Sequence, residues 1–95
     1  MLRFEWDPDK AERNFQKHQV AFSEAATVFG DPLGVTVYDP DHSFEEDRYI
    51  LIGTSEAGRL LLVAHTEHSD VIRIISARTL TRAERKAYAE RNLES

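Results

Sequence analysis

Three apolar runs joined by very short turns place the strongest constraint on how this chain can fold. The runs are Arg48–Gly53, Arg59–Thr66 and Val71–Ser76, and the turns between them centre on Glu56–Gly58 and Ser69–Asp70. Turns of this length cannot hold the crossover that parallel neighbours need, so the runs predict an antiparallel meander. Because the runs are nearly continuous rather than alternating, we expect both faces of the sheet to be covered, one by helices and the other by a partner.

The amino-terminal third predicts one short strand and two helices. Phe4–Trp6 alternates briefly as a strand. Asp7 is the predicted N-cap of a helix whose first residue is Pro8 and which runs to His18. A second, shorter helix is predicted to start at Ser23, as its N-cap, and to end at residue 29.

The carboxy-terminal third contains the clearest helix start. Thr81 is three residues before Glu84, the spacing of a capping box, so a helix is predicted from Arg82 to Leu93. With a strand over residues 35–38, the element order is that of an α+β fold. It has two N-terminal helices, an antiparallel sheet of about four strands and a C-terminal helix, and we expect residues 1–95 to form a single domain.

Charge is distributed unevenly along the chain. The net charge is -5, but residues 1–58 hold five Lys and Arg against twelve Asp and Glu, whereas residues 59–95 hold seven against five. The acidic balance argues against a general nucleic-acid coat protein, while the arginine-rich segment suits bidentate contacts with phosphate. The chain has no cysteine and no apolar stretch of signal-peptide or membrane-span length, so we expect a cytoplasmic protein.

Arginines on or beside the predicted strands are the first candidates for a site. They are Arg48, Arg59, Arg73 and Arg78. Arg73 has two apolar residues on each side, and a guanidinium in an apolar strand needs a specific partner. If Arg48, His65 and Arg73 share a sheet face, they form a cationic patch that the acidic run Glu45–Asp47 can neutralise. The alternative is a set of surface ion pairs, each worth about 0–1 kcal/mol.

Three further polar side chains have two interpretations each. His18 is either an amphipathic ring at the edge of the core or a general acid or base. Glu84 is either the capping carboxylate or an acid catalyst, and Tyr88 either packs on the sheet or presents its hydroxyl to the site. The spacing of the histidines at positions 42, 65 and 68 matches no metal motif, so neither metal nor cofactor is expected.

A series of short motifs runs through nearly the whole chain in a specific order and spacing. The motifs are Phe4-Glu5-Trp6-Asp7 with Lys10, Asn14 and Lys17-His18, then Phe22-x-x-Ala25, Val28-Phe29, Asp31-Pro32, Glu46-x-Arg48, Ile52-Gly53, Arg73-Ile74-Ile75-Ser76-Ala77-Arg78 and Thr81-x-x-Glu84-Arg85-x-x-Tyr88. Together they resemble the BrnT toxin family. The resemblance implies a RelE-like fold and an endoribonuclease toxin of a type II toxin–antitoxin module, which inhibits translation by metal-independent RNA cleavage.

The resemblance also implies a partner. We expect a BrnA-like ribbon-helix-helix antitoxin that neutralises the toxin in a heterotetramer, with DNA contacted only through the antitoxin and with no membrane involved.

RNA cleavage without metal requires a base for the 2′-hydroxyl, cations for the charge on phosphorus and an acid for the leaving oxygen. Arg48, Arg73 and Arg78 are expected to stabilise the charge, and His18 or Glu46 to move protons. The expected RNA-binding residues are Lys17, Arg59, Arg82 and Arg85, and the possible additional site residues are His65, Glu84 and Tyr88.

Two positions depart from the family pattern. Gln19 stands where the family usually has glycine after Lys-His, so we expect a reshaped exit from the first helix. His68 stands where the family often has arginine. If that arginine holds RNA, activity is expected to be weakened or to depend on pH.

A hypothesis of a different class is a non-catalytic binding module, or a degenerate toxin that acts in an antitoxin-bound repressor complex. The acidic first half and the arginine-rich second half would then pair with a charged partner. Partner binding without ribonuclease activity would favour this alternative.

Overall fold

A five-stranded sheet forms the centre of the computed structural model, which describes residues 2–94 of the chain. The strands are β1 (Arg3–Glu5), β2 (Val35–Asp39), β3 (Arg48–Thr54), β4 (Leu60–His68) and β5 (Val71–Thr79), and they lie in the order β1-β5-β4-β3-β2. The strands from β2 to β5 pair with their chain neighbours in antiparallel fashion, which confirms the predicted meander.

The fifth strand, β1, pairs with β5 in parallel. The prediction of a purely antiparallel sheet of about four strands is therefore wrong, and the sheet is mixed. The chain leaves β1 through two helices and returns at β2, on the opposite edge. The pairing of a three-residue strand with β5 depends on that long connection, which local sequence patterns do not specify.

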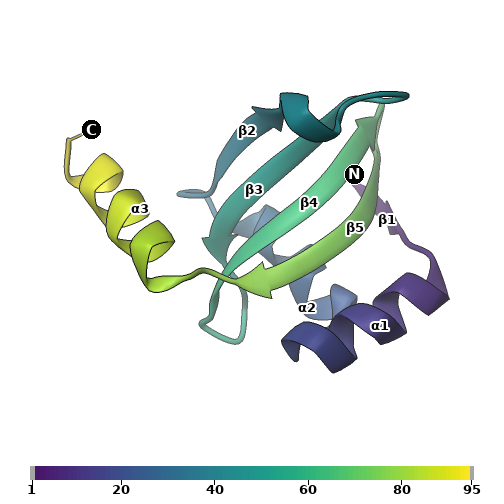
Figure 1. The fold of residues 1–95 in the computed structure, drawn as a ribbon, viewed down its shortest axis with the longest axis horizontal. Helices are drawn as coiled ribbons and strands as arrows, with labels where there is room; N and C mark the ends of the chain where they lie inside the picture. Colours follow the sequence, from purple (N-terminus) through teal and green to yellow (C-terminus); the bar gives the residue numbers. More distant parts are fainter. Residues whose placement is uncertain (1, 95) are drawn as a thin grey trace.

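The two faces of the sheet are covered unequally (Figure 1). α1 (Pro8–His18) and α2 (Phe22–Thr27), which continues as the 3-10 turn η1 (Val28–Gly30), lie on one face. α3 (Arg82–Glu94) follows β5 and projects away from the sheet, and a short turn, η2 (Pro40–His42), follows β2. We call the face that α1 and α2 leave uncovered the open face. Helical cover of one face is confirmed, and a partner on the open face stays a prediction.

The core lies between the sheet and the first two helices, and its packing decides where α2 begins. Phe22 is the first residue of α2, and Ala21, with no side-chain hydrogen bond, takes the N-cap place predicted for Ser23. Burial of a phenylalanine stabilises by about 1.5–3 kcal/mol, which exceeds the roughly 1 kcal/mol of a serine cap. Trp6 lies outside the strand predicted for it, because β1 ends at Glu5 and the indole packs edge-on against the Phe22 ring.

α1 begins and ends at the predicted residues. The Asp7 carboxylate accepts a hydrogen bond from the backbone N–H of Asp9 at 2.9 Å, and Pro8 is the first helical residue. Gln19 follows the helix in the left-handed conformation, with φ 59° and ψ 31°, and its backbone N–H donates to the carbonyl of Phe15. The predicted reshaping of this exit is wrong, since glutamine adopts the conformation that glycine would take at lower cost.

A buried asparagine joins α1 to β5. The side-chain amide of Asn14 donates to the carbonyls of Ala77 at 2.8 Å and Val20 at 3.0 Å, and its oxygen accepts from the backbone N–H of Ala77 at 3.0 Å. β1 pairs with β5 only as far as Arg73. Asn14 therefore supplies, to the part of β5 beyond β1, the hydrogen bonds that a neighbouring strand would make.

A β-bulge in β5 changes which side chains share a face. Ala64 pairs with Ser76 but His65 pairs with Ile74, so Ile75 is an extra residue in the strand. Residues five apart in a regular strand point to opposite faces. The bulge instead places Arg73 and Arg78 on the same, open face.

Replacement of Asn14 tests the joint between α1 and β5. We expect Asn14→Asp, which keeps the size but removes both donated hydrogen bonds, to lower the free energy of unfolding by about 2–3 kcal/mol in urea denaturation. Gln16→Ala is the control, because the Gln16 side-chain amide bonds only to exposed Glu12, and its expected effect is below about 0.5 kcal/mol. Equal effects of the two substitutions would contradict this role for Asn14.

Candidate functional site

A row of three side chains crosses the open face at the end of the sheet that contains the β4–β5 hairpin. Thr66 of β4 pairs with Arg73 of β5, and Tyr49 of β3 pairs with His65. Arg48 precedes Tyr49, so the alternation of the strands puts Arg48, Thr66 and Arg73 on the open face. Two guanidinium groups thus flank a threonine hydroxyl.

The Thr66 hydroxyl is the unusual atom of this row. Thr66 is only 1% exposed. Its Oγ1 is the buried side-chain oxygen that has no hydrogen-bond partner within residues 2–94. An unpaired buried hydroxyl costs roughly 1–3 kcal/mol and needs an explanation. Thr66 lies between Arg48 and Arg73 in the row.

A carboxylate and a histidine complete this end of the face. Nε2 of His68 lies 3.0 Å from Oε2 of Glu46. The hydrogen bond with His68 is the main reason that the pKa of Glu46 lies below its ordinary value, and the charges of His68, Arg73 and Arg48 lower it further. Glu46 is therefore an anion at neutral pH beside three groups that carry or can carry positive charge.

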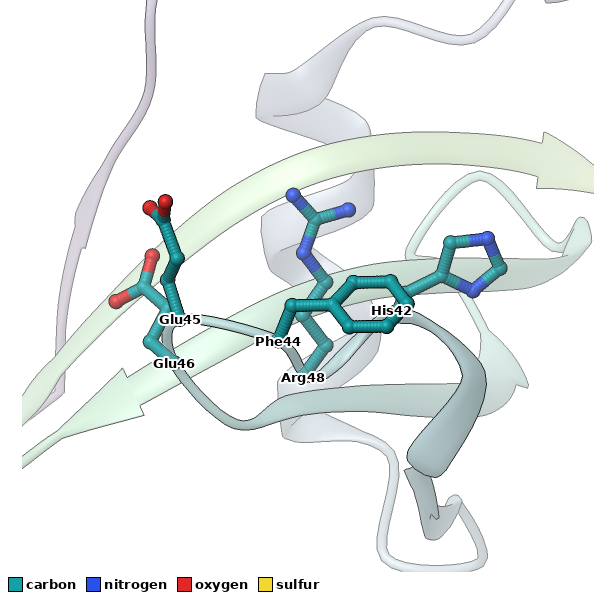
Figure 2. Close-up of a pocket in the computed structure, with 5 residues that line it drawn as sticks. All are labelled: His42, Phe44, Glu45, Glu46 and Arg48. Carbon is teal, nitrogen blue, oxygen red and sulfur yellow. The ribbon is translucent and has the colours of Figure 1, made fainter.

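Figure 2 shows the pocket beside this row. It has a volume of about 270 Å³ and is lined by His42, Phe44, Glu45, Glu46 and Arg48. The Arg48 side chain extends upward in the middle of the view, and the carboxylates of Glu45 and Glu46 lie together to its left. We call Glu46, Arg48, Thr66, His68 and Arg73 the hairpin-end site.

Other predicted site residues lie at the far end of β5. Arg78 donates to both carboxylate oxygens of Glu84, at 2.7 and 3.0 Å. His18 lies at the end of α1, and its pKa is lowered by partial burial and then by the charges of Lys17 and Arg78. These residues form a second cationic group, in which Arg78 is already paired.

The five predicted catalytic residues therefore fall into two groups. Arg73 and Arg78 pair with Thr66 and Leu62, which are four residues apart in β4, a separation of roughly 13 Å along the strand. The Arg78 guanidinium is also held by the Glu84 carboxylate, at the end of β5 away from Arg73. Glu46 and Arg48 belong with Arg73, whereas His18 belongs with Arg78.

His65 does not take part in the cationic patch. Its side chain points to the helix-covered face, is 0% exposed and packs against Phe29, with ring centroids 4.8 Å apart. Its Nε2 lies 2.8 Å from Oε2 of Glu67. The placement of His65 beside Arg48 and Arg73 is therefore wrong, because alternation along β4 turns it to the core while Thr66 takes the open face.

The remaining candidates have structural partners or lie on α3. Arg59 donates to the carboxylate of Glu24 in α2 and to the carbonyl of Gln19, which ties the β3–β4 turn to the helices. The Tyr88 hydroxyl donates to the carbonyl of Leu33 at 3.2 Å. Arg82 and Arg85 are exposed on α3. Glu84 and Thr81 make both bonds of the predicted capping box.

Thr66 was not among the predicted site residues, and His68 was considered as a metal ligand and as a departure from a family pattern but not as a catalytic residue. Strand register places Thr66 between Arg48 and Arg73, and the residues near Thr66 in the sequence give no indication of that register. Within the part of the chain that the structure describes, no three His, Asp or Glu side chains form a group that could hold a metal ion. No helix among those residues is long and apolar enough to span a membrane.

Comparisons with known proteins give a family and a fold. The family model described as "Ribonuclease toxin, BrnT, of type II toxin-antitoxin system" matches residues 6–84. The structure is similar to the 1.1 Å crystal structure of the Brucella abortus ribonuclease toxin BrnT, with a TM-score of 0.62 and 19% identity, over 86% of this chain and 100% of that chain. At this identity the likeness shows the fold alone. The comparison with curated proteins gives no match.

The ion pair between Arg78 and Glu84 predicts a pH dependence of stability. Arg78 and the capping amide of Thr81 lower the pKa of Glu84 from 4.5 to about 2. Its contribution to the free energy of unfolding is therefore complete above about pH 4.5 and is lost as the pH falls toward 2. We expect Glu84→Gln to destabilise by about 1 kcal/mol at pH 7 and by less at pH 3. Urea unfolding at both pH values measures this, with exposed Glu90→Gln as the control, and a pH-independent difference would contradict it.

Proposed function

Because the chain belongs to the BrnT family of ribonuclease toxins of type II toxin–antitoxin systems, we propose that it is a metal-independent endoribonuclease that cleaves RNA at the hairpin-end site. The observation that carries this proposal is the unpartnered Thr66 hydroxyl between Arg48 and Arg73, with an acid–base pair beside it. We further propose that the fold is of the RelE-like ribonuclease class and that cleavage inhibits translation in the cytoplasm.

Arg48 and Arg73 are proposed to stabilise the negative charge that develops on the phosphate during cleavage. When the 2′-hydroxyl attacks, the phosphate becomes a dianionic, phosphorane-like species. Arg48 and Arg73 lie on either side of Thr66 in the row, and we propose that both guanidinium groups donate to the non-bridging oxygens. Fixed donors of this kind are typically worth a factor of about 100–1,000 each.

Proton transfer is assigned to the Glu46–His68 pair. Glu46, whose pKa is lowered by His68 and the arginines, is the anionic base that takes the proton of the 2′-hydroxyl. His68 in its protonated form donates to the 5′-oxygen as the bond from phosphorus to that oxygen breaks. The products are a 2′,3′-cyclic phosphate and a 5′-hydroxyl.

The second cationic group is proposed to bind RNA rather than to cleave it. Lys17, Arg82 and Arg85 would contact phosphates beyond the scissile one, and His18 and Arg78 would contribute to the same surface. This assignment narrows the predicted catalytic set to the residues that the sheet brings together. Arg59 is the weakest of the predicted RNA-binding residues, because its guanidinium is paired with Glu24.

Family membership implies an antitoxin, and we propose that it is BrnA-like. A ribbon-helix-helix antitoxin would contact DNA, and the two proteins would form a heterotetramer. The open face supports a docking place, since an apolar groove of about 200 Å³ lies between α3 and the sheet and includes Val35, Val37, Ile52 and Tyr88. Cover of the open face would block RNA by occupation.

The arginine assignment is tested by separate Arg48→Ala and Arg73→Ala variants. Each is expected to lower the rate of RNA cleavage about 100- to 1,000-fold and to relieve growth arrest on induced expression, and activity should persist in a metal chelator. Arg13→Ala, an exposed arginine on α1, is the control. Full activity in both variants, shown to be folded, would refute this site. Soluble wild-type protein that binds its antitoxin but cleaves no RNA would favour the binding-module hypothesis.

The role of His68 as an acid is tested with a substrate that needs no acid. His68→Ala is expected to slow cleavage of ordinary RNA by about 100- to 10,000-fold. On RNA with a 5′-bridging sulfur, whose thiolate leaves without a proton, the same variant should approach the wild-type rate.

Arg48→Ala is the matched comparison, because it should stay slow on both substrates. His68 contacts the Glu46 carboxylate, so cleavage of both substrates must also be measured for Glu46→Gln. A His68→Ala defect of equal size on the two substrates would show that His68 does not protonate the leaving oxygen.

A further inference from the structure

Phe44 is the most exposed of the large apolar side chains whose burial the structure describes, which are those of residues 2–91. It is 88% exposed, although burial of a phenylalanine stabilises by about 1.5–3 kcal/mol. Single apolar side chains on a surface are common, so exposure alone assigns nothing. The surroundings of this ring are what distinguish it.

The loop that carries Phe44 is tied at both ends by one hydroxyl. The Ser43 hydroxyl donates to the carbonyl of Asp39 at 2.6 Å and accepts from the backbone N–H of Arg48 at 2.9 Å. Tyr38 donates to the carboxylate of Asp47 at 3.1 Å. The loop between η2 and β3 is therefore held to the sheet by its own polar groups, and the Phe44 ring is not needed to anchor it.

Phe44 lines the pocket that also contains two residues of the hairpin-end site. The side chains around that pocket are His42, Glu45, Glu46 and Arg48. In Figure 2 the Phe44 ring lies between the His42 imidazole and the stem of Arg48, with the Glu45 and Glu46 carboxylates on the other side. The volume of about 270 Å³ lies just below the range for drug-sized ligands and suits one planar ring system.

We propose that this pocket binds one unstacked nucleobase of the RNA, next to the scissile phosphate, with the base stacked on Phe44. The inference rests on the proposed ribonuclease function and names the part of the substrate that the site reads. Single-stranded RNA is recognised by stacking of splayed bases on aromatic rings and guanidinium planes. Phe44 offers such a ring, and Arg48 joins the pocket to the phosphate row.

The charge of the pocket selects a base rather than a phosphate. Glu45 and Glu46 repel phosphate, and the Glu45 side chain is exposed. A carboxylate accepts from the N–H groups of a base edge. Guanine presents two adjacent donors, the ring N1–H and the 2-amino group, whereas uracil presents a single N–H between two carbonyls. The pocket therefore favours guanine over uracil.

Four proteins separate stacking from simple apolar contact. Binding is measured with a short 2′-fluoro RNA containing guanine, which lacks the attacking hydroxyl and stays intact. Phe44→Ala and Phe44→Leu are expected to raise Kd about 5- to 150-fold, the range of stacking one base on an aromatic ring. Phe44→Trp should bind at least as tightly as wild type. Leu33→Ala, an exposed apolar residue before β2, is the control and should leave Kd unchanged.

The base preference is tested with the same RNA after guanine is replaced by inosine, which lacks the 2-amino group. Wild type should bind the inosine RNA about 3- to 10-fold more weakly, the effect of one hydrogen bond to a charged acceptor. Glu45→Gln should reduce that difference. Equal binding of guanine, inosine and uracil RNAs by wild type would overturn the preference.

Further outcomes of these measurements distinguish the stacking subsite from the ribonuclease function. Wild-type Kd in both Phe44→Ala and Phe44→Leu, or in Phe44→Leu alone, would overturn the stacking subsite. If Phe44→Ala kept RNA affinity but lost affinity for the antitoxin, the ring would be a protein anchor and the subsite would be wrong. Wild-type protein that bound RNA through Phe44 but left ordinary RNA intact would refute the ribonuclease function and leave the subsite standing.

Discussion

The amide of Asn14 is the contact on which the arrangement of the rest depends. It makes three buried hydrogen bonds, two of them to the backbone of Ala77. These bonds fix α1 against the part of β5 that no strand covers, just after the bulge at Ile75. The bulge in turn decides which arginines reach the open face. The buried hydrogen bonds of Asn14 thus hold β5 next to the bulge that places Arg73 and Arg78 on the open face.

The arginines of this chain divide by whether a carboxylate already holds them. Arg59 and Arg78 are paired with Glu24 and Glu84, and these pairs fasten a turn and a helix to the sheet. Arg48 and Arg73 flank the unpartnered hydroxyl of Thr66 instead. Charge count therefore says little about where an anion binds in this protein. Of the four arginines on or beside strands β3 to β5, Arg48 and Arg73 belong to the proposed centre.

An acidic protein can act on RNA if its negative charge is placed where phosphates do not pass. The loop between η2 and β3 holds the acidic run Glu45–Asp47 beside Arg48. In the proposed arrangement, Glu46 takes a proton and Glu45 reads a base edge, while the arginines receive the phosphate. The electrostatic roles of neighbouring residues are then complementary, and the net charge of -5 does not oppose binding at the site itself.

Sequence patterns predicted the helices and strands whose bounds depend on neighbouring residues. The capping box of Thr81 and Glu84, the start of α1 at Pro8 and the meander from β3 to β5 follow from the sequence, because caps, turns and hydrophobic period act over a few residues. The start of α2 at Phe22 was not predictable in this way, since long-range burial outweighed the Ser23 cap.

The sequence by itself determined the family, the helices and strands, and the residue types from which a site can be built. Tertiary structure decided which of those residues meet. It turned His65 into the core, brought Thr66 between Arg48 and Arg73, paired His68 with Glu46 and kept His18 at the far end of β5. The physical reason is that strand register and a single bulge set the facing of every side chain in the sheet, and both depend on contacts between residues far apart in the chain.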